Sequence, residues 1–283
     1  MHKNQVRRAD RWSCGDHVFT FGPGETLVMG ILNVTPDSFS DGGTHNGFSE
    51  ALEWARRMRD EGADIIDVGG ESTRPGFDEE GVTLEEERRR VLPVVEALVK
   101  EGFIVSVDTS KPEMMTDVAA LGAHIINDIR GFTVPGALEA AAATKCGLVV
   151  MHREGEPHHY DDLHAEVEAF LREQTVRLEA LGVDPSRICW DPGFGFGKTV
   201  VENFSLVKAT DRYTASGYPF LMGLSRKRAI GAATGVGAAR DRVQGSVAGA
   251  LISAERGAHV VRVHDVEPTV QALAVWREVA KAP

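Results

Sequence analysis

Apolar and polar residues alternate along this chain in blocks of two kinds. Short, nearly continuous apolar runs are each followed by a longer segment with apolar residues at helical spacing, such as residues 49–62 and 163–182. A continuous apolar run is typical of a parallel strand covered on both faces, and the spacing that follows predicts an amphipathic helix. The runs lie at residues 27–33, 64–70, 104–109, 125–129, 148–152, 188–193, 220–225 and 260–264.

Repetition of this unit predicts the fold class. Eight strand and helix units in about 250 residues indicate an α/β protein built as a closed (β/α)8 TIM barrel. A doubly wound sheet is the main alternative, but it needs a GxGxxG turn after the first strand, and "NVTPDSFSDGG" follows here. We expect one barrel domain over residues 16–283, a short strand or hairpin at 16–21 beneath the barrel, and a frayed segment at 1–15.

Composition narrows the classes of partner and compartment. The 283 residues carry a formal net charge of -11, which argues against a surface for nucleic acid or anionic lipid. The 3 cysteines form no CxxC pair and no ligand spacing for zinc, so a reducing cytoplasm is favoured. The N-terminal segment lacks the uninterrupted apolar stretch of a secretory signal, and nowhere do about 18 apolar residues run together, so we expect neither export nor insertion.

Polar residues stand at the end of every predicted strand. The active sites of such barrels lie at the C-terminal ends of the strands, here called the barrel mouth, so these side chains are expected to meet a ligand together. The residues are Asn33, Asp67 with Glu71, Asp108, Asn127, His152, Asp191, Ser225, and Arg262 with His264.

Asp108, Asn127 and Asp191 form the first candidate group. Each ends an apolar run, where an unpaired polar group costs about 1–3 kcal/mol. A heterocycle with ring NH, amino and carbonyl groups would satisfy two carboxylates and an amide together. The alternative is a hydrogen-bond network internal to the barrel.

Arg262 and His264 form the second group. They alternate on the last strand, so both face the barrel interior, where a guanidinium suits a phosphate. A salt bridge from Arg262 to a neighbouring aspartate is the alternative. Asn33 offers an oxygen to Mg²⁺, which takes few protein ligands and completes its shell with water and phosphate. An equally good interpretation of Asn33 is that its side chain caps the turn after the strand.

Two further segments follow strands directly. The segment 223–231, "GLSRKRAIG", sets cations at the start of a helix, where they attract an anion unless they form an ordinary solvated charge run. The segment 191–199, "DPGFGFGKT", lacks the spacing of a nucleotide-triphosphate loop, and its glycines indicate mobility or close approach.

His152, His158 and His159 lack the spacing of metal ligands and are interpreted as surface or network residues.

Seven of these segments stand together in a recognisable order. "GILNVTPDSFSDGG", "DVGGESTRPG", "VSVDTSKPE", "INDIRG", "DPGFGFGKT", "GLSRKR" and "RVHDV" resemble the dihydropteroate synthase family from residue 29 to 266. The resemblance implies a pterin-binding TIM barrel of folate biosynthesis. Such a transferase condenses 6-hydroxymethyl-7,8-dihydropterin diphosphate with p-aminobenzoate and releases pyrophosphate. It also implies Mg²⁺ as cofactor, inhibition by sulfonamides, and a homodimer formed by the late helices around 241–279.

The resemblance also assigns residues to subsites. The pterin site falls on Asp108, Asn127, Met151, Asp191, Phe196, Gly223 and Lys227. The diphosphate site falls on Asn33, which also binds the metal, and on Thr73, Arg262 and His264. The p-aminobenzoate site falls on Phe39, Pro75, Ser225 and Arg228, and the catalytic set on Asp37, Phe39, Arg74 and Lys227. Two loops, 35–43 and 72–76, are implied to close over the arylamine.

Some residues depart from the family pattern. Arg153 and Glu154 follow "VMH" where relatives often carry "MQG", Phe77 replaces a small residue, and Arg228 stands where many relatives carry serine. Two alternatives therefore remain beside a synthase. One is the pterin-binding barrel of corrinoid-dependent methyltransferases, which would leave the "NVTPDSFSDGG" loop and the Arg262 and His264 pair without purpose. The other is a catalytically silent pterin-binding protein.

Overall fold

Eight parallel strands form the centre of the protein. The structure is a computed structural model that describes residues 9–22, 24–35, 44–71, 81–155 and 158–282. The strands are β3 (Leu27–Asn33), β4 (Ile65–Gly69), β5 (Val105–Asp108), β6 (Ile125–Asp128), β7 (Gly147–Met151), β8 (Ile188–Asp191), β9 (Leu221–Met222) and β10 (Val260–Val263). Each lies at one of the apolar runs, so the predicted strands are confirmed.

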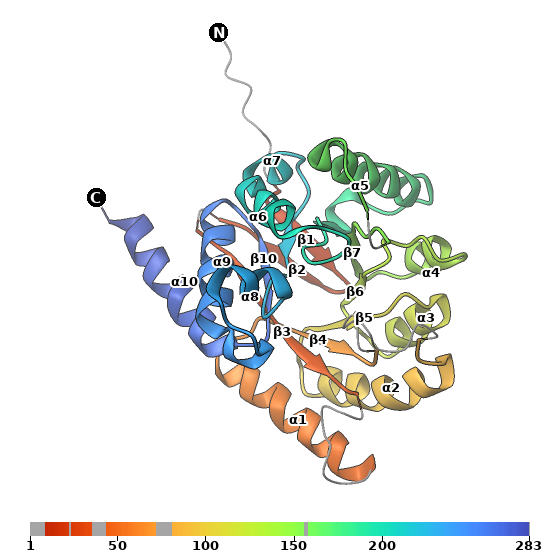
Figure 1. Ribbon diagram of the computed structural model, residues 1–283. Coiled ribbons are helices and arrows are strands. Elements are labelled where there is room, and N and C mark those ends of the chain that lie inside the picture. Colours follow the sequence, from red (N-terminus) through yellow and green to blue (C-terminus); the bar gives the residue numbers. More distant parts are fainter. Residues whose placement is uncertain (1–8, 23, 36–43, 72–80, 156–157, 283) are drawn as a thin grey trace.

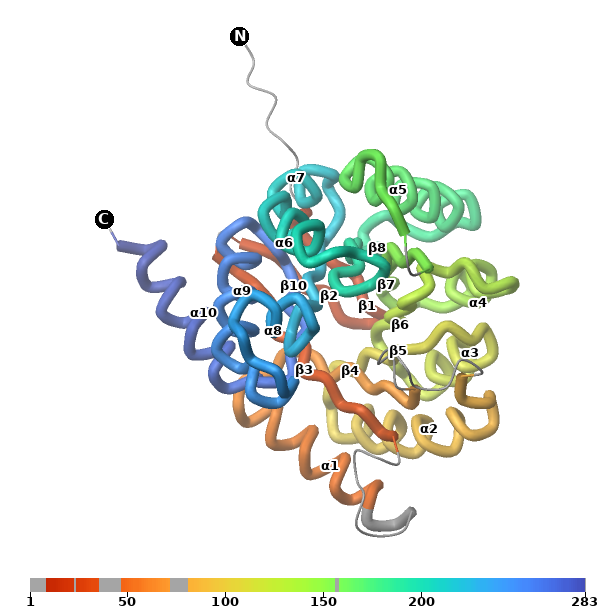
Figure 2. The backbone as a smooth tube through the Cα atoms, viewed as in Figure 1, coloured from red at the N-terminus to blue at the C-terminus, as the bar shows by residue number. Residues whose placement is uncertain are grey.

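The strands join into a ring. Their order is β8-β7-β6-β5-β4-β3-β10-β9, and a parallel bridge between Trp190 and Phe220 connects the two ends of this sheet. Figure 2 shows the chain returning on itself, with the late strand β10 beside the early strand β3, its hydrogen-bonded partner. The TIM-barrel prediction is therefore confirmed.

Helices surround the ring of strands (Figure 1). They are α1 (Thr44–Asp60), α2 (Leu84–Lys100), α3 (Pro112–Ala120), α4 (Ala137–Ala143), α5 (Leu163–Ala180), α6 (Val200–Lys208), α7 (Thr210–Thr214), α8 (Arg228–Thr234), α9 (Val243–Glu255) and α10 (Val266–Lys281). Side chains close in the sequence cap the N-termini of some of these helices. Asp162 caps α5, and Thr199 with Glu202 forms a capping box at α6. Within the described residues, none of the helices combines the length and apolar character needed to cross a bilayer.

A hairpin closes the lower end of the barrel. Strands β1 (Arg11–Cys14) and β2 (His17–Thr20) pair antiparallel, and Trp12 and Cys14 pack against the inward residues at the start of the barrel strands. The indole Nε1 of Trp12 donates to the carbonyl oxygen of Arg187 over 2.9 Å. The hairpin thus begins at Arg11, inside the segment 1–15 that was expected to be frayed. That expectation was wrong for residues 11–14, because β1 gains a partner strand and a buried tryptophan.

Candidate active site at the barrel mouth

Strand register brings the predicted polar residues into one layer. Asn33 pairs with Gly69, Gly69 with Asp108, and Asp108 with Asn127 across four neighbouring strands. Residues in register on parallel strands have side chains on the same face, which here is the barrel interior. On the other side of the ring, Met151 pairs with Asp191 in the same way. The ends of the strands therefore gather these side chains at the mouth, as predicted.

Arg262 bridges two carboxylates at this level of the barrel. Its Nε donates to Asp67 Oδ2 over 2.6 Å, and its Nη2 donates to Asp108 Oδ2 over 3.0 Å. The amide Nδ2 of Asn127 also donates to Asp67 Oδ2, over 3.2 Å. The salt-bridge reading of Arg262 is thus correct, and the arginine is held at the mouth by two carboxylates. Asp67 also bonds Asn127 directly and is linked to Asp108 through Arg262. These bonds form a hydrogen-bond network of the kind that was the alternative interpretation of Asp108 and Asn127.

Sequence reasoning placed Asp67 among the polar strand ends at the barrel mouth but assigned it to none of the subsites. Its side chain is wholly buried, and its Oδ1 has no hydrogen-bond partner among the described residues. The signal was present in "DIIDVGG", where a charged residue interrupts an apolar run and must find a partner in the core. The partner, Arg262, is distant in the sequence, so only the closed barrel reveals the pair.

Burial changes the acid–base properties of Asp108. Desolvation raises its pKa to about 7, against the opposing effect of the Arg262 charge. For Arg262, burial disfavours the charge, but Asp67 and Asp108 outweigh it and raise the pKa. The guanidinium therefore stays charged, whereas Asp108 exists in both protonation states near neutral pH and can accept or donate a hydrogen bond.

Asp191 and Lys227 form the opposite wall. The main-chain N–H of Gly193 donates to Asp191 Oδ1 over 2.7 Å, while burial raises the pKa of this carboxyl and Lys227 opposes the change. Burial also lowers the pKa of Lys227 to about 7. The Lys227 ammonium donates to the carbonyl oxygen of Phe194 and lies 4.4 Å from the centroid of the Phe196 ring. An acid, a base and an aromatic face therefore meet at one place.

Gly223 leaves room between the two walls. A Cβ placed on it would lie 3.8 Å from Arg262 Cβ and 3.8 Å from Asp191 Oδ2. These are ordinary contact distances, so a methyl group would occupy the space between these residues without a clash. Gly223, which the resemblance assigns to the pterin site, therefore leaves open space between Arg262 and Asp191.

Ser225 and His264 are brought together by the segments that follow β9 and β10. The buried Ser225 hydroxyl lies 3.1 Å from His264 Nδ1 and accepts from the His264 main-chain N–H over 3.2 Å. The basic segment itself is divided. Arg226, with φ of 59°, turns to pair with Asp265, while Arg228 is exposed as the first residue of α8. Only Lys227 of these three cations reaches the Asp191 wall.

Five predicted site residues lie outside the described residues. They are Asp37 and Phe39 of the first loop and Thr73, Arg74 and Pro75 of the second, and the departure at Phe77 lies there too. Arg153 is described, and its guanidinium lies 5.4 Å from the centroid of the Phe196 ring. His152 is buried, so of the two interpretations given above, a surface residue or a network residue, the second is correct for it.

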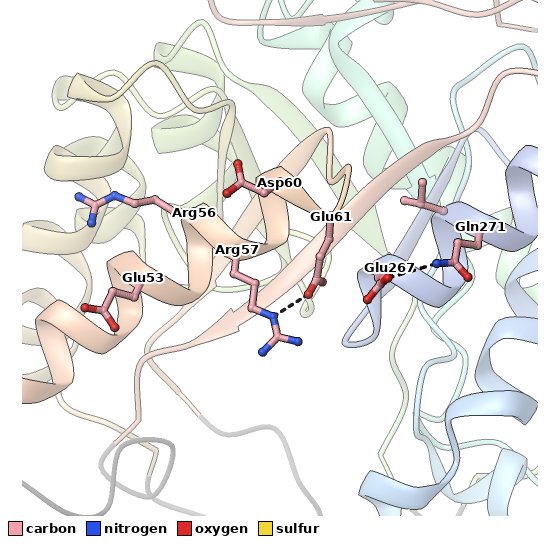
Figure 3. Close-up of a pocket in the computed structure, with 8 residues that line it drawn as sticks. Glu53, Arg56, Arg57, Asp60, Glu61, Glu267 and Gln271 are labelled. Atoms are coloured by element: carbon pink, nitrogen blue, oxygen red, sulfur yellow. Dashed lines mark hydrogen bonds and ion pairs between the residues drawn. The ribbon is translucent and has the colours of Figure 1, made fainter.

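A surface cavity away from the barrel mouth is unrelated to this chemistry. It measures about 660 Å³ and lies on the outside of the barrel between α1 and α10. Figure 3 shows it lined by charged side chains that are partly satisfied by each other, as in the Arg57–Glu61 ion pair over 2.7 Å. None of the predicted site residues lines it. Among the described residues, no three acidic, histidine or cysteine side chains form a group that would hold a metal ion.

Comparison with known proteins agrees with this geometry. The profile of the family described as "Pterin binding enzyme" matches residues 29–264. Dihydropteroate synthase of Escherichia coli (strain K12) is 51% identical over 255 residues, which cover 88% of this chain and 89% of that protein.

Solved structures give the same result. The Xanthomonas albilineans dihydropteroate synthase with 4-aminobenzoic acid superposes with a TM-score of 0.92 at 48% identity, covering 97% of this chain and 100% of that one. The Yersinia pestis dihydropteroate synthase in a sulfonamide drug complex superposes with a TM-score of 0.87 at 43% identity, covering 96% and 100%.

Proposed function

Because this chain belongs to the dihydropteroate synthase family of pterin-binding enzymes, we propose that it joins a pterin to an arylamine. The substrates are 6-hydroxymethyl-7,8-dihydropterin diphosphate and p-aminobenzoate, and the products are 7,8-dihydropteroate and pyrophosphate. The observation that carries the proposal is the pair of walls at the mouth, Asp108 with Arg262 and Asp191 with Lys227, separated by Gly223.

The pterin site lies between these walls. Asp191 and Asp108 accept hydrogen bonds from amino and ring N–H groups, and Asn127 supplies an amide that both donates and accepts. Buried carboxylates form strong hydrogen bonds because no water competes for them. The Phe196 ring and Met151 offer apolar surface to a flat heterocycle. This combination supports a pterin better than a purely internal network, which would not require the gap at Gly223.

The diphosphate site lies on the Arg262 and His264 side. Arg262 stands on β10 and His264 directly follows this strand, and their partners Asp67 and Ser225 hold them in place. A diphosphate that leaves the substrate carries developing negative charge, which the fixed guanidinium stabilises. Thr73 belongs to this site by resemblance and lies outside the described residues.

The donor set near Asn33 fits Mg²⁺. Gly69 places no side chain between Asn33 and Asp108, and a Cβ there would lie 3.6 Å from Asn33 Oδ1. Mg²⁺ is commonly held by one or two protein oxygens together with water and substrate phosphates, so a complete protein cage is not needed. Asn33 would hold the ion, which when bound supplies positive charge to the phosphate oxygens.

The arylamine site lies beside the lysine. Ser225 and Arg228 flank Lys227, and Phe39 and Pro75 come from the two loops by resemblance. We infer that sulfonamides compete at this position. The C–O bond to the diphosphate breaks and leaves a pterin methylene cation. The arylamine nitrogen attacks this carbon, forms the new C–N bond and then loses a proton, so no side chain needs to act as nucleophile. Nearby carboxylates stabilise the cation. By resemblance, the loops that carry Asp37, Phe39 and Arg74, which lie outside the described residues, exclude water.

The late helices support a homodimer. Ile252 on α9 and Val275 and Val279 on α10 are 44%, 66% and 67% exposed, which leaves apolar surface on adjacent helices. We infer that a second copy covers this surface. Sedimentation equilibrium tests it: the wild type should be a dimer and Val279→Glu a monomer, and a monomeric wild type would contradict it.

The three cysteines are free and buried, which supports a reducing cytoplasm.

A mass-spectrometric assay tests the function. The protein is mixed with the pterin diphosphate, Mg²⁺ and p-aminobenzoate, and dihydropteroate and pyrophosphate should appear in equal amounts. Asp191→Asn should reduce turnover strongly, whereas Asp161→Asn, an exposed aspartate, should not. A wild-type protein that binds pterin without forming product would be a silent binding protein, and the proposal would fail.

A further inference from the structure

The loop after β8 is built from left-handed turns. Gly193, Gly195 and Gly197 have φ of 71°, 86° and 61°. Glycine adopts these values readily, whereas other residues are strained there. The carbonyl oxygens of Gly193, Phe194 and Phe196 each accept a hydrogen bond from a lysine ammonium. The loop therefore depends on cations for its shape.

Lys198 supplies two of these bonds and one more. Its Nζ donates to Gly193 O over 3.1 Å and to Phe196 O over 3.0 Å, and lies 3.1 Å from Nδ1 of His152. A lysine ammonium has three hydrogens and no acceptor. All three are thus directed at protein acceptors, and burial lowers the pKa of Lys198 only to about 8, so the ammonium persists at neutral pH.

His152 is suited to accept this bond. It follows β7, its side chain is 1% exposed, and burial beside Lys198 lowers its pKa to about 3. The imidazole is therefore neutral, with Nδ1 as acceptor and the proton on Nε2. The His152 main-chain N–H donates to Asp191 O over 3.0 Å. Lys198 thus joins the ends of β7 and β8.

The same turn touches the site. A Cβ on Gly193 would lie 1.7 Å from His152 O, so the loop packs directly on the main chain of His152. From this position the Gly193 N–H reaches Asp191 Oδ1 over 2.7 Å. At the other end of the turn, the Phe196 ring lies beside the Lys227 ammonium.

We propose that Lys198 is a positioning residue for the pterin site: its ammonium fixes the turn of residues 193–196, which orients the Asp191 carboxylate and the Phe196 ring. Because its hydrogens are all given to protein acceptors, Lys198 acts through the turn and does not contact substrate. The inference rests on the proposed function, since it assigns Asp191 and Phe196 to the pterin.

The test replaces the ammonium alone. Lys198→Met keeps the length and the apolar stem of the side chain but removes its donors. Lys208→Met is the matched control, because Lys208 is an exposed lysine at the end of α6. We expect Lys198→Met to raise KM for the pterin diphosphate about tenfold and to change KM for p-aminobenzoate less than about twofold. Lys208→Met should change neither. Calorimetry with 6-hydroxymethyl-7,8-dihydropterin should show the same weakening for Lys198→Met.

The outcomes separate the two proposals. If the wild type makes no dihydropteroate, the proposed function fails. If the wild type is active but Lys198→Met binds pterin normally, or raises both KM values equally, the positioning role is wrong. Should Lys198→Met not fold by circular dichroism, Lys198→Arg decides. Its planar guanidinium keeps the charge but cannot direct three converging hydrogens, so KM for the pterin should rise about threefold. An unchanged value would contradict the role.

Discussion

The buried carboxylate of Asp67 accepts a hydrogen bond from Nε of Arg262 over 2.6 Å, across a sequence separation of 195 residues. The pair joins β4 to β10, with β3 between them in the ring. A buried ion pair is costly to break, because removing one partner leaves an uncompensated charge in the core. Asp67 thus holds the arginine that we propose stabilises the leaving diphosphate.

Asp67→Asn should therefore destabilise the protein and weaken diphosphate binding. The shape is kept, but Arg262 loses a charged partner, so the free energy of unfolding should fall by about 3 kcal/mol. Urea denaturation measures this, and Asp60→Asn, at an exposed position on α1, should shift it by less than about 0.5 kcal/mol. A variant as stable as the wild type would mean that Asp108 alone neutralises Arg262.

Asp108 should make stability depend on pH. Burial raises its pKa from 3.8 to about 7, so between these values the folded state holds a proton that the unfolded state has released. The contribution of Asp108 is therefore most favourable below about pH 4 and is lost as the pH rises to about 7. The stability of the wild type relative to Asp108→Asn should fall over this interval.

Urea denaturation at pH 5 and pH 7.5 gives this difference directly. Asp161→Asn, which removes an exposed carboxylate, should keep the slope of the wild type. Parallel curves for the wild type and Asp108→Asn would show that Asp108 is already ionised in the folded protein at pH 5.

The strands were predictable from local pattern, whereas the partners within the site were not. Each barrel strand carries its own signal, because a strand covered on both faces must be apolar along its length. The inward placement of Asp108, Asn127 and Asp191 followed from their position at strand ends. The partner of Arg262 did not follow, because Asp67 and Arg262 meet only when the ring closes.

The same limit applies to the loop after β8 and to the hairpin. Lys198 stands in a glycine-rich motif that lacks the spacing of a nucleotide-triphosphate loop, and nothing in the sequence indicates which carbonyl groups it binds. The acceptors appear only after Gly193 and Gly195 adopt left-handed values. In the hairpin, β1 lies in a polar and basic N-terminal segment whose composition does not predict a strand. This strand depends on the burial of Trp12. Tertiary contacts outweighed local composition there.

Gly223→Ala should separate binding from stability. Its Cβ would make only ordinary contacts at 3.8 Å, so the free energy of unfolding should change by less than about 1 kcal/mol. The methyl group would nonetheless occupy the proposed pterin position, and KM for the pterin diphosphate should rise about tenfold or more. Gly237→Ala, where a Cβ has nothing within 4 Å, should change neither quantity. Normal pterin binding by Gly223→Ala would place the heterocycle elsewhere.

Ser225→Ala should reveal whether this serine serves His264 or the arylamine. The hydroxyl is buried and lies 3.1 Å from His264 Nδ1, so its loss removes one of the contacts that orient the imidazole toward the proposed diphosphate site. We expect KM for the pterin diphosphate to rise about fivefold. The matched control is Ser205→Ala, which removes a serine hydroxyl that lies 2.8 Å from His164 Nε2 between α5 and α6. It should leave both KM values unchanged. A rise confined to KM for p-aminobenzoate would assign Ser225 to the arylamine site and contradict its role in orienting His264.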